Sequence, residues 1–110
     1  MNLETFAKES HQISLDHGFK NDNLDQRLML IVDEISEAHE ELRKGKDPQE
    51  VYYANSHITR DKPEGFGIEL ADAVIRILDL AEACGLDIVG LLELKQAYNK
   101  TRPFKHGKEF

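Results

Sequence analysis

Two pairs of acidic residues in this sequence have a spacing that could bring four carboxylates together. Glu34 and Glu37 are three positions apart, and so are Glu69 and Asp72. Residues three apart lie on the same face of an α-helix, so each pair would present its side chains in one direction. Carboxylate oxygens are the ligands that hard divalent cations such as Mg²⁺ and Mn²⁺ prefer. Two helices that face each other would therefore form a four-carboxylate cation site.

The segment that carries the second pair, residues 64–84, has an unusual distribution of polar residues. Glu69, Asp72, Arg76 and Asp79 fall on one narrow side of a helix, and nearly all other positions are apolar. A surface helix normally has a narrow apolar stripe and a wide polar face. We therefore expect this helix to be mostly buried. Its acids should face a cleft or a subunit interface and need a cation or a hydrogen-bonded partner there.

The first pair lies in another helical segment, residues 24–44, with Asn23 as its N-cap. The apolar positions of this segment predict the following core face: Leu28, Ile31, Val32, Ile35, Ala38 and Leu42. Glu34, Glu37 and Glu41 lie beside that face. Taken alone, such an acidic stripe could form a solvated helix surface, so the more apolar helix of residues 64–84 carries the greater weight.

The remaining segments complete an all-α, four-helix, bundle-like single domain over residues 1–110. Residues 3–17 and 88–100 have the periodicity of amphipathic helices, and Asp87 is a suitable N-cap for the second of them. No segment has the alternating pattern of a strand. Apolar residues that four short helices cannot hide, such as Met29, predict a homodimer or a higher homo-oligomer.

The connection over residues 45–63 is long for a small domain, and long connections are often lids. Asp47-Pro48-Gln49-Glu50 has the N-cap, proline and glutamate of a helix start, so we expect one or two helical turns there. Tyr52 and Tyr53 could stack on a nucleobase, or they could cover the edge of the core.

The composition of the chain excludes several classes of protein. The net charge of −7 argues against a general nucleic-acid binder or a protein of anionic membranes. The charge is uneven, since residues 1–94 hold 9 basic and 20 acidic side chains, whereas residues 95–110 hold 5 and 1. The single Cys84 excludes an internal disulfide, and its apolar neighbours predict a buried thiol. Without a signal peptide or an apolar run of membrane-spanning length, we expect a soluble cytoplasmic protein.

The acidic motifs and the C-terminal segment together resemble those of the MazG-like all-α nucleoside triphosphate pyrophosphohydrolases. That family carries E-E-x-x-E on one helix and E-x-x-D on the next. Here residues 33–37 read Asp-Glu-Ile-Ser-Glu, with Asp in the first place, and residues 69–72 read Glu-Leu-Ala-Asp. The basic residues 99–108 are similar to the C-terminal segment of a short, single-domain branch. The connection at 45–63 is longer than in compact members, which leaves the substrate open.

The resemblance implies Mg²⁺-dependent hydrolysis of a nucleoside triphosphate to the monophosphate and pyrophosphate. By the resemblance, four carboxylates would hold the metal: Glu34, Glu37, Glu69 and Asp72. Asp33 could orient or deprotonate the attacking water. Positive side chains are wanted on the distal phosphates, where charge accumulates. The candidates are Arg76 and, in a basic arm of residues 99–110, Lys100 and Arg102.

Other interpretations compete with this one. A carboxylate-bridged di-iron bundle needs Glu-x-x-His on two helices, and no glutamate stands three positions before His11, His39 or His57. A non-enzymatic helical dimerisation or regulatory module would carry the acids incidentally. Phosphoribosyl-ATP and dUTP pyrophosphohydrolase activities remain open within the family. Arg76 could form an ion pair with Asp79 instead of contacting phosphate.

Overall fold

The computed structural model describes residues 1–19, 23–54 and 61–103 as four helices and two short strands. In chain order the elements are α1 (Leu3–Asp16), α2 (Leu24–Arg43), β1 (Tyr52–Ala54), β2 (Lys62–Glu64), α3 (Phe66–Ala83) and α4 (Ile88–Thr101). The all-α prediction is confirmed in outline, and each predicted helix lies within two residues of its expected bounds.

Local capping explains why the helices begin where they do. The side chain of Asn23 accepts a hydrogen bond from the backbone N–H of Gln26, and Asp87 accepts one from Gly90. Each bond satisfies one of the N–H groups that the first turn of a helix leaves without an intrahelical partner. Both N-caps were expected from the sequence and are confirmed.

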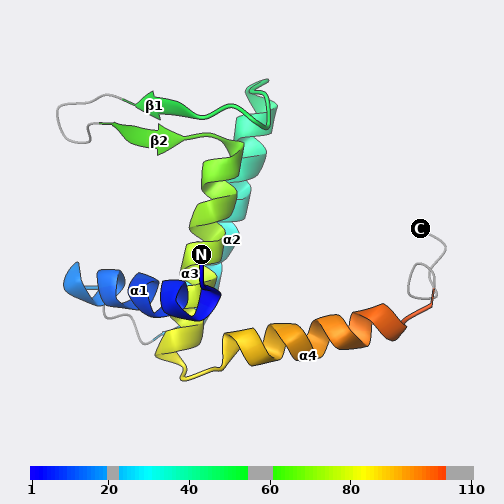
Figure 1. The fold of residues 1–110 in the computed structure, drawn as a ribbon. Coiled ribbons are helices and arrows are strands. Elements are labelled where there is room, and N and C mark those ends of the chain that lie inside the picture. The colour runs from blue at the N-terminus through cyan, green and yellow to red at the C-terminus, as the bar shows by residue number, and fades with distance from the viewer. Residues whose placement is uncertain (20–22, 55–60, 104–110) are drawn as a thin grey trace.

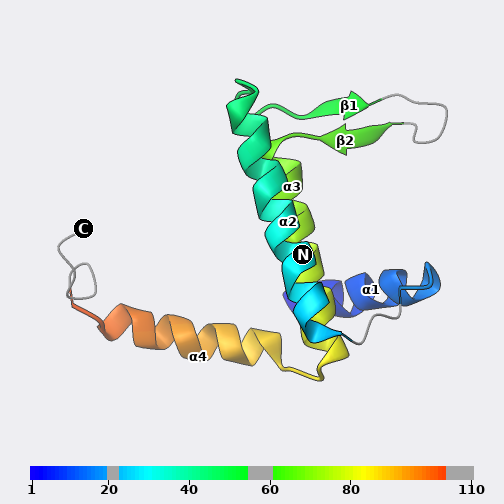
Figure 2. The ribbon, with the colours of Figure 1, turned by 180° about the vertical axis from the view of Figure 1, so that it is seen from behind.

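The arrangement is built on α2 and α3, which run antiparallel side by side (Figures 1 and 2). Helix α1 packs against α3 near one end of this pair, and the two strands extend from the other end. Helix α4 contacts α1 and α3 but projects away from the pair, so among the described elements it does not contact α2. The expectation of a four-helix, bundle-like packing is therefore wrong for α4 within one chain.

The connection between α2 and α3 forms an antiparallel β-hairpin, in which Tyr52 lies opposite Glu64. The prediction of no strand is wrong here, because two three-residue strands are too short to show an alternating pattern. The predicted helical turn at Asp47 is also wrong. Its carboxylate accepts the backbone N–H of Gln49, which makes a tight turn without a helix. Gly65 joins the hairpin to α3 with a φ of 138°, where an added Cβ would collide with the backbone oxygen of Glu50.

Burial differs sharply from the sequence prediction. Five of the six positions predicted for the core face of α2 are not buried; the four most exposed are Leu28, Val32, Ile35 and Leu42. Of those six residues only Ala38 is buried. The two other buried residues of α2 are acids, Glu34 and Glu41. In α3 only Ala73, Leu78 and Ala81 are buried, so this helix is not mostly enclosed within one chain. Cys84 is exposed, and the predicted buried thiol is wrong.

The departures in α2 have one physical cause. Helix α2 turns its acidic side, and not its apolar side, towards α3. The periodicity of a sequence shows which residues share a face, but it does not show which neighbour covers that face.

None of the helices within the described ranges is long and apolar enough to cross a membrane.

Candidate functional site

Three glutamates meet between α2 and α3. Glu34 and Glu37 come from successive turns of α2, and Glu69 comes from the first turn of α3. One carboxylate oxygen from each residue lies within 4.8 Å of the others. We call these three residues the glutamate triad. A cation could be coordinated by all three residues, because their oxygens approach one point from two helices.

The Glu69 carboxyl is partly buried and lacks part of its hydrogen bonding, and its pKa is raised. Its Oε2 atom is buried and has no hydrogen-bond partner among the described residues. Burial is the main cause that raises the pKa of Glu69 to about 8; hydrogen bonds with Glu37 and Glu34 and the negative charge of Glu37 raise it further. Asp72 contributes further repulsion. A bound cation would relieve both the missing partner and the repulsion, so the donor set fits a hard divalent ion.

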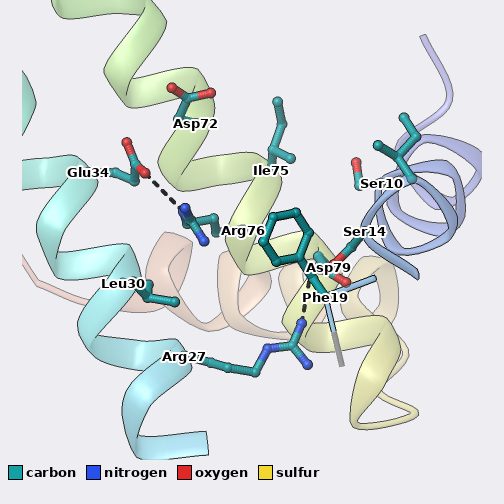
Figure 3. Close-up of a pocket in the computed structure, with 11 residues that line it drawn as sticks. Ser10, Ser14, Phe19, Arg27, Leu30, Glu34, Asp72, Ile75, Arg76 and Asp79 are labelled. Atoms are coloured by element: carbon teal, nitrogen blue, oxygen red, sulfur yellow. Dashed lines mark hydrogen bonds and ion pairs between the residues drawn. The ribbon is translucent and has the colours of Figure 1, made fainter. Parts of the chain in front are cut away.

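Asp72 and Asp33 are the two predicted acids that do not belong to the triad. Asp72 is half-buried one turn beyond Glu69 and is not one of the three converging residues. Burial raises its pKa, and so does the charge of Glu34, whereas Arg76 lowers it. Figure 3 shows Asp72 and Glu34 on adjacent helices, facing the same space. Asp33 is exposed on α2, next to Glu34 in sequence but outside the triad.

Arg76 lies beside the triad and is held by one of its members. The Arg76 Nε atom donates a hydrogen bond to Glu34 Oε1 over 2.9 Å. Glu34 has only 12% of its side chain exposed, whereas Arg76 has 44% exposed and can still reach a ligand. The alternative ion pair of Arg76 with Asp79 is not formed.

Asp79, which lies near the other end of α3 from Glu69, forms ion pairs with two other helices. Its carboxylate pairs with Arg27 of α2 at 2.9 Å and with the His11 ring of α1 at 2.7 Å. The Arg27 pair is visible in Figure 3. Asp79 thus connects three helices, and its charge is compensated inside the chain.

A cavity of about 370 Å³ opens beside these residues, between α1, α2 and α3 (Figure 3). Glu34, Asp72 and Arg76 border it towards the triad, and Phe19 and Ser10 border it towards α1. The remaining lining residues are Ile13, Ser14, Arg27, Leu30, Ile75 and Asp79. Its mixture of apolar walls, hydroxyls and charges is typical of a small-molecule site.

Glu41, the third member of the acidic stripe predicted on α2, has a separate role. The Tyr52 hydroxyl lies 2.7 and 2.9 Å from the two carboxylate oxygens of Glu41 and donates to them. The hydrogen bond to Glu41 raises the pKa of Tyr52 to about 12. Tyr52 therefore attaches the β-hairpin to α2, and its hydroxyl is committed there. Tyr53 is 62% exposed, so it does not cover the core.

The predicted phosphate-binding residues of the arm are far from the triad. Lys100 lies in the last turn of α4, and Arg102 caps that helix at its outer end. The arm's residues 104–110, including Lys105 and Lys108, lie outside the described residues. Sequence reasoning missed the cavity residues of α1 and the start of α2, such as Ser10, because single residues on separate helices carry no spacing signal.

The chain was also compared with known proteins. No protein-family model, curated protein or solved structure matches it. A functional interpretation therefore depends on the geometry of the triad, on its neighbouring cavity and on the acidic motifs themselves.

Proposed function

We propose that this protein is a Mg²⁺-dependent nucleoside triphosphate pyrophosphohydrolase, with Mn²⁺ as an alternative ion. The observation that carries the proposal is the glutamate triad. It holds a buried, unpartnered Glu69 oxygen near two further carboxylates, one of which, Glu34, lines the cavity. Elsewhere in the described parts, a buried acid such as Glu41 has a donor. The acidic motifs, which resemble those of the MazG-like enzymes, agree with this interpretation.

Each residue of the site would have a role that follows from its position. The triad and Asp72 would hold the ion, which would supply charge neutralisation for the phosphates and a water of lowered pKa. Asp33 is exposed beside Glu34 and would orient or deprotonate that water. Arg76, bound to Glu34 but 44% exposed, would bind phosphoryl oxygens on which negative charge grows.

The cavity is suited to the nucleoside part of the substrate. Its volume of about 370 Å³ is in the range of small-molecule sites. Phe19 offers an aromatic face, and Ser10 and Ser14 offer hydroxyl groups for a base or a sugar. The base preference, including the phosphoribosyl-ATP and dUTP alternatives, would be set by these residues, since the triad would bind the phosphates through the ion.

We also propose that the protein is a homodimer or a higher homo-oligomer. The exposed apolar residues of α2 and α3 support this, because monomers rarely expose so many large apolar side chains on one helix pair. The same observation favours a second candidate function, a helical dimerisation or regulatory module without catalysis. The two candidates differ in one measurable property, the response to a divalent ion.

The deciding experiment measures pyrophosphate release from a panel of standard and damaged nucleoside triphosphates, phosphoribosyl-ATP and dUTP, with and without Mg²⁺. The test variant is Glu69→Gln, which keeps the size of the side chain and removes its charge. The matched control is Glu40→Gln on α2, whose carboxylate is exposed and, among the described residues, pairs only with Arg43 at 3.8 Å. Mg²⁺-dependent release that survives in the control and is lost in Glu69→Gln supports the proposal. No release from any substrate would favour the dimerisation module.

A further inference from the structure

A nucleotide bound as proposed would have one direction along the α2–α3 pair. The cavity for its nucleoside extends towards Arg27 and Asp79. The β-hairpin is attached at Glu41, at the opposite end of the pair, and the glutamate triad lies between the two. Arg27 and Glu34 are roughly 10 Å apart along α2. A nucleotide with its nucleoside in the cavity and its phosphates at the triad therefore directs its distal phosphates towards the hairpin.

The hairpin and α1 lie on the same side of this helix pair. Figures 1 and 2 show them extending from opposite ends of the pair towards that side, whereas α4 extends the other way. The cavity is bordered by α1, so it lies on the side of the hairpin as well. Among the described elements the hairpin is thus placed to reach the distal phosphates, and the outer end of α4 with Lys100 and Arg102 is not.

One face of the hairpin is turned towards the helices, and Lys62 belongs to it. Residues directly opposite each other in an antiparallel pair share a face, and so do residues two apart in one strand. Tyr52 lies opposite Glu64, and Glu64 is two positions from Lys62, so the three side chains are on one face. The Tyr52 hydroxyl donates to Glu41 of α2, which directs this face towards the helix pair.

The base of the hairpin is attached to both helices that form the triad. Strand β2 packs against α3, and Tyr52 in β1 holds the hairpin on α2 at 2.7 Å. Gly65, between β2 and α3, lies so close to the backbone of Glu50 that no Cβ would fit there. These contacts give the strand that carries Lys62 a definite position relative to the first turn of α3, where Glu69 lies.

The ammonium group of Lys62 is weakly held, and its charge acts on the site. Its Nζ atom is 3.8 Å from Glu64 Oε1, a long ion pair, and the side chain is 58% exposed. An exposed pair of this kind contributes little stability, so the ammonium group can turn towards a ligand. Burial raises the pKa of Asp72, but the positive charges of Arg76 and Lys62 act against that rise. Asp72 is therefore within electrostatic reach of cations on two elements, α3 and β2.

We propose that Lys62 is a second phosphate-binding residue: its ammonium group binds the distal phosphates from the hairpin, while Arg76 binds phosphoryl oxygens from α3. This inference rests on the proposed function for the identity of the ligand. Lysine binds phosphate as a point charge on a flexible stem, so a strand near the site is sufficient to position it. Negative charge grows on the leaving pyrophosphate, so Lys62 would stabilise the transition state more than the bound substrate.

The charge of Lys62 should have opposite effects on the two ligands of the site. An ammonium group attracts phosphate and repels a divalent cation. Lys62→Gln should therefore weaken phosphate binding and leave the affinity for Mg²⁺ alone unchanged or slightly higher. A residue that only maintained the shape of the hairpin would, when replaced, lower both affinities together. The two affinities thus separate a phosphate contact from a structural role.

Calorimetric titration of the full chain measures both affinities, first with Mg²⁺ alone and then with the Mg²⁺ complex of inorganic pyrophosphate. Pyrophosphate has no base, so the cavity does not contribute to its binding. In Lys62→Gln its dissociation constant should rise by roughly tenfold to a hundredfold, whereas Lys62→Arg, which keeps the charge, should retain most of the affinity. The matched control is Lys8→Gln on α1, which removes a similarly exposed lysine that pairs with Glu4 at 3.2 Å and should leave both affinities unchanged.

Each contrary result has a definite meaning. Pyrophosphate bound as tightly by Lys62→Gln as by the wild type would overturn the inference, and so would a parallel loss of Mg²⁺ affinity. Hydrolysis of a nucleoside triphosphate by the wild type would in either case leave the proposed function in place without Lys62. Weaker pyrophosphate binding in the variant, without hydrolysis of any triphosphate by the wild type, would keep Lys62 as a phosphate ligand and refute the proposed function. Failure of the wild type to bind pyrophosphate would overturn both.

Discussion

Three sets of acids lie along the α2–α3 pair, and all of them except Glu37 are buried or half-buried; their charges are compensated differently. Near one end Glu41 accepts both contacts of the Tyr52 hydroxyl, and near the other Asp79 is paired with Arg27 and His11. Between them, within the part of the chain that the structure describes, the glutamate triad has a single cationic contact, from Arg76 to Glu34, and an unpartnered Glu69 oxygen.

The lack of a donor for one Glu69 oxygen of the triad among the described residues, in contrast to Glu41 and Asp79, favours a functional role for the triad. A buried carboxylate without a donor is costly, and this chain provides donors at the two neighbouring positions. A like-charge cluster between two satisfied acids is therefore not a general feature of this helix pair. We propose that an external partner binds at this position, and a divalent ion fits three convergent carboxylates.

The strongest test of this contrast is charge removal in the triad. Glu69→Gln should lower Mg²⁺-dependent turnover by a hundredfold or more, on the order of what loss of a metal ligand costs, and should abolish the rise in Tm with Mg²⁺. Differential scanning fluorimetry over a Mg²⁺ titration measures the second effect. Retention of the full thermal shift in the variant would show that the ion binds elsewhere.

Asp79 should contribute to the stability of the fold. Asp79→Asn removes the charge that faces Arg27 and His11, whose side chains are 16% and 29% exposed. We expect a loss of about 2 kcal/mol in the free energy of unfolding, measured by urea denaturation, because the charge-assisted contacts of Asp79 with Arg27 and His11 are lost. The control is Glu4→Gln, which breaks only an exposed ion pair with Lys8. Equal stability of the two variants would contradict the role of Asp79.

The pH dependence should distinguish the triad from the satisfied acids. Burial raises the pKa of Glu69 to about 8 in the fold, above its ordinary value of 4.5, so the folded metal-free protein holds a proton that the unfolded chain releases. Stability without metal should therefore be greatest below pH 4.5 with respect to this group and fall as pH rises to about 8.

Metal binding reverses that trend. The ion must displace the proton on Glu69, so Mg²⁺ affinity should rise by up to about tenfold per pH unit until the pH reaches the pKa near 8. Calorimetric titration in buffers of different ionisation enthalpy would count the released proton. Binding that is independent of pH between 6 and 8 would contradict the raised pKa.

The smallest effect is expected at the hairpin. Tyr52→Phe removes the donor to Glu41, a residue only 6% exposed, and should cost about 1–2 kcal/mol of unfolding free energy. The thermal shift with Mg²⁺ should be unchanged, because Glu41 is not one of the converging triad residues. Tyr53→Phe, at an exposed neighbour, serves as the control. A reduced metal response in Tyr52→Phe would extend the site to the hairpin.

The sequence by itself determined the helices and the composition of the site. Helical period, the N-caps at Asn23 and Asp87 and the glycine stops depend on interactions within a few residues, so the sequence alone predicts them. The same local rule placed Glu34 and Glu37 on successive turns and marked Glu69 as an acid in an apolar helix. Nothing in that reasoning required knowledge of how the helices pack.

Only the tertiary structure decided which face of each helix meets another. Periodicity groups Leu28, Val32 and Ile35 on one side of α2, yet α3 covers the acidic side instead, because the energy of burial depends on the partner surface and not on the helix alone. The attachment of Tyr52 to Glu41 and the pairing of Asp79 with Arg27 join residues distant in sequence. The outward direction of α4 likewise follows from hydrogen bonds around Gly85, whose geometry the apolar pattern of α4 does not encode.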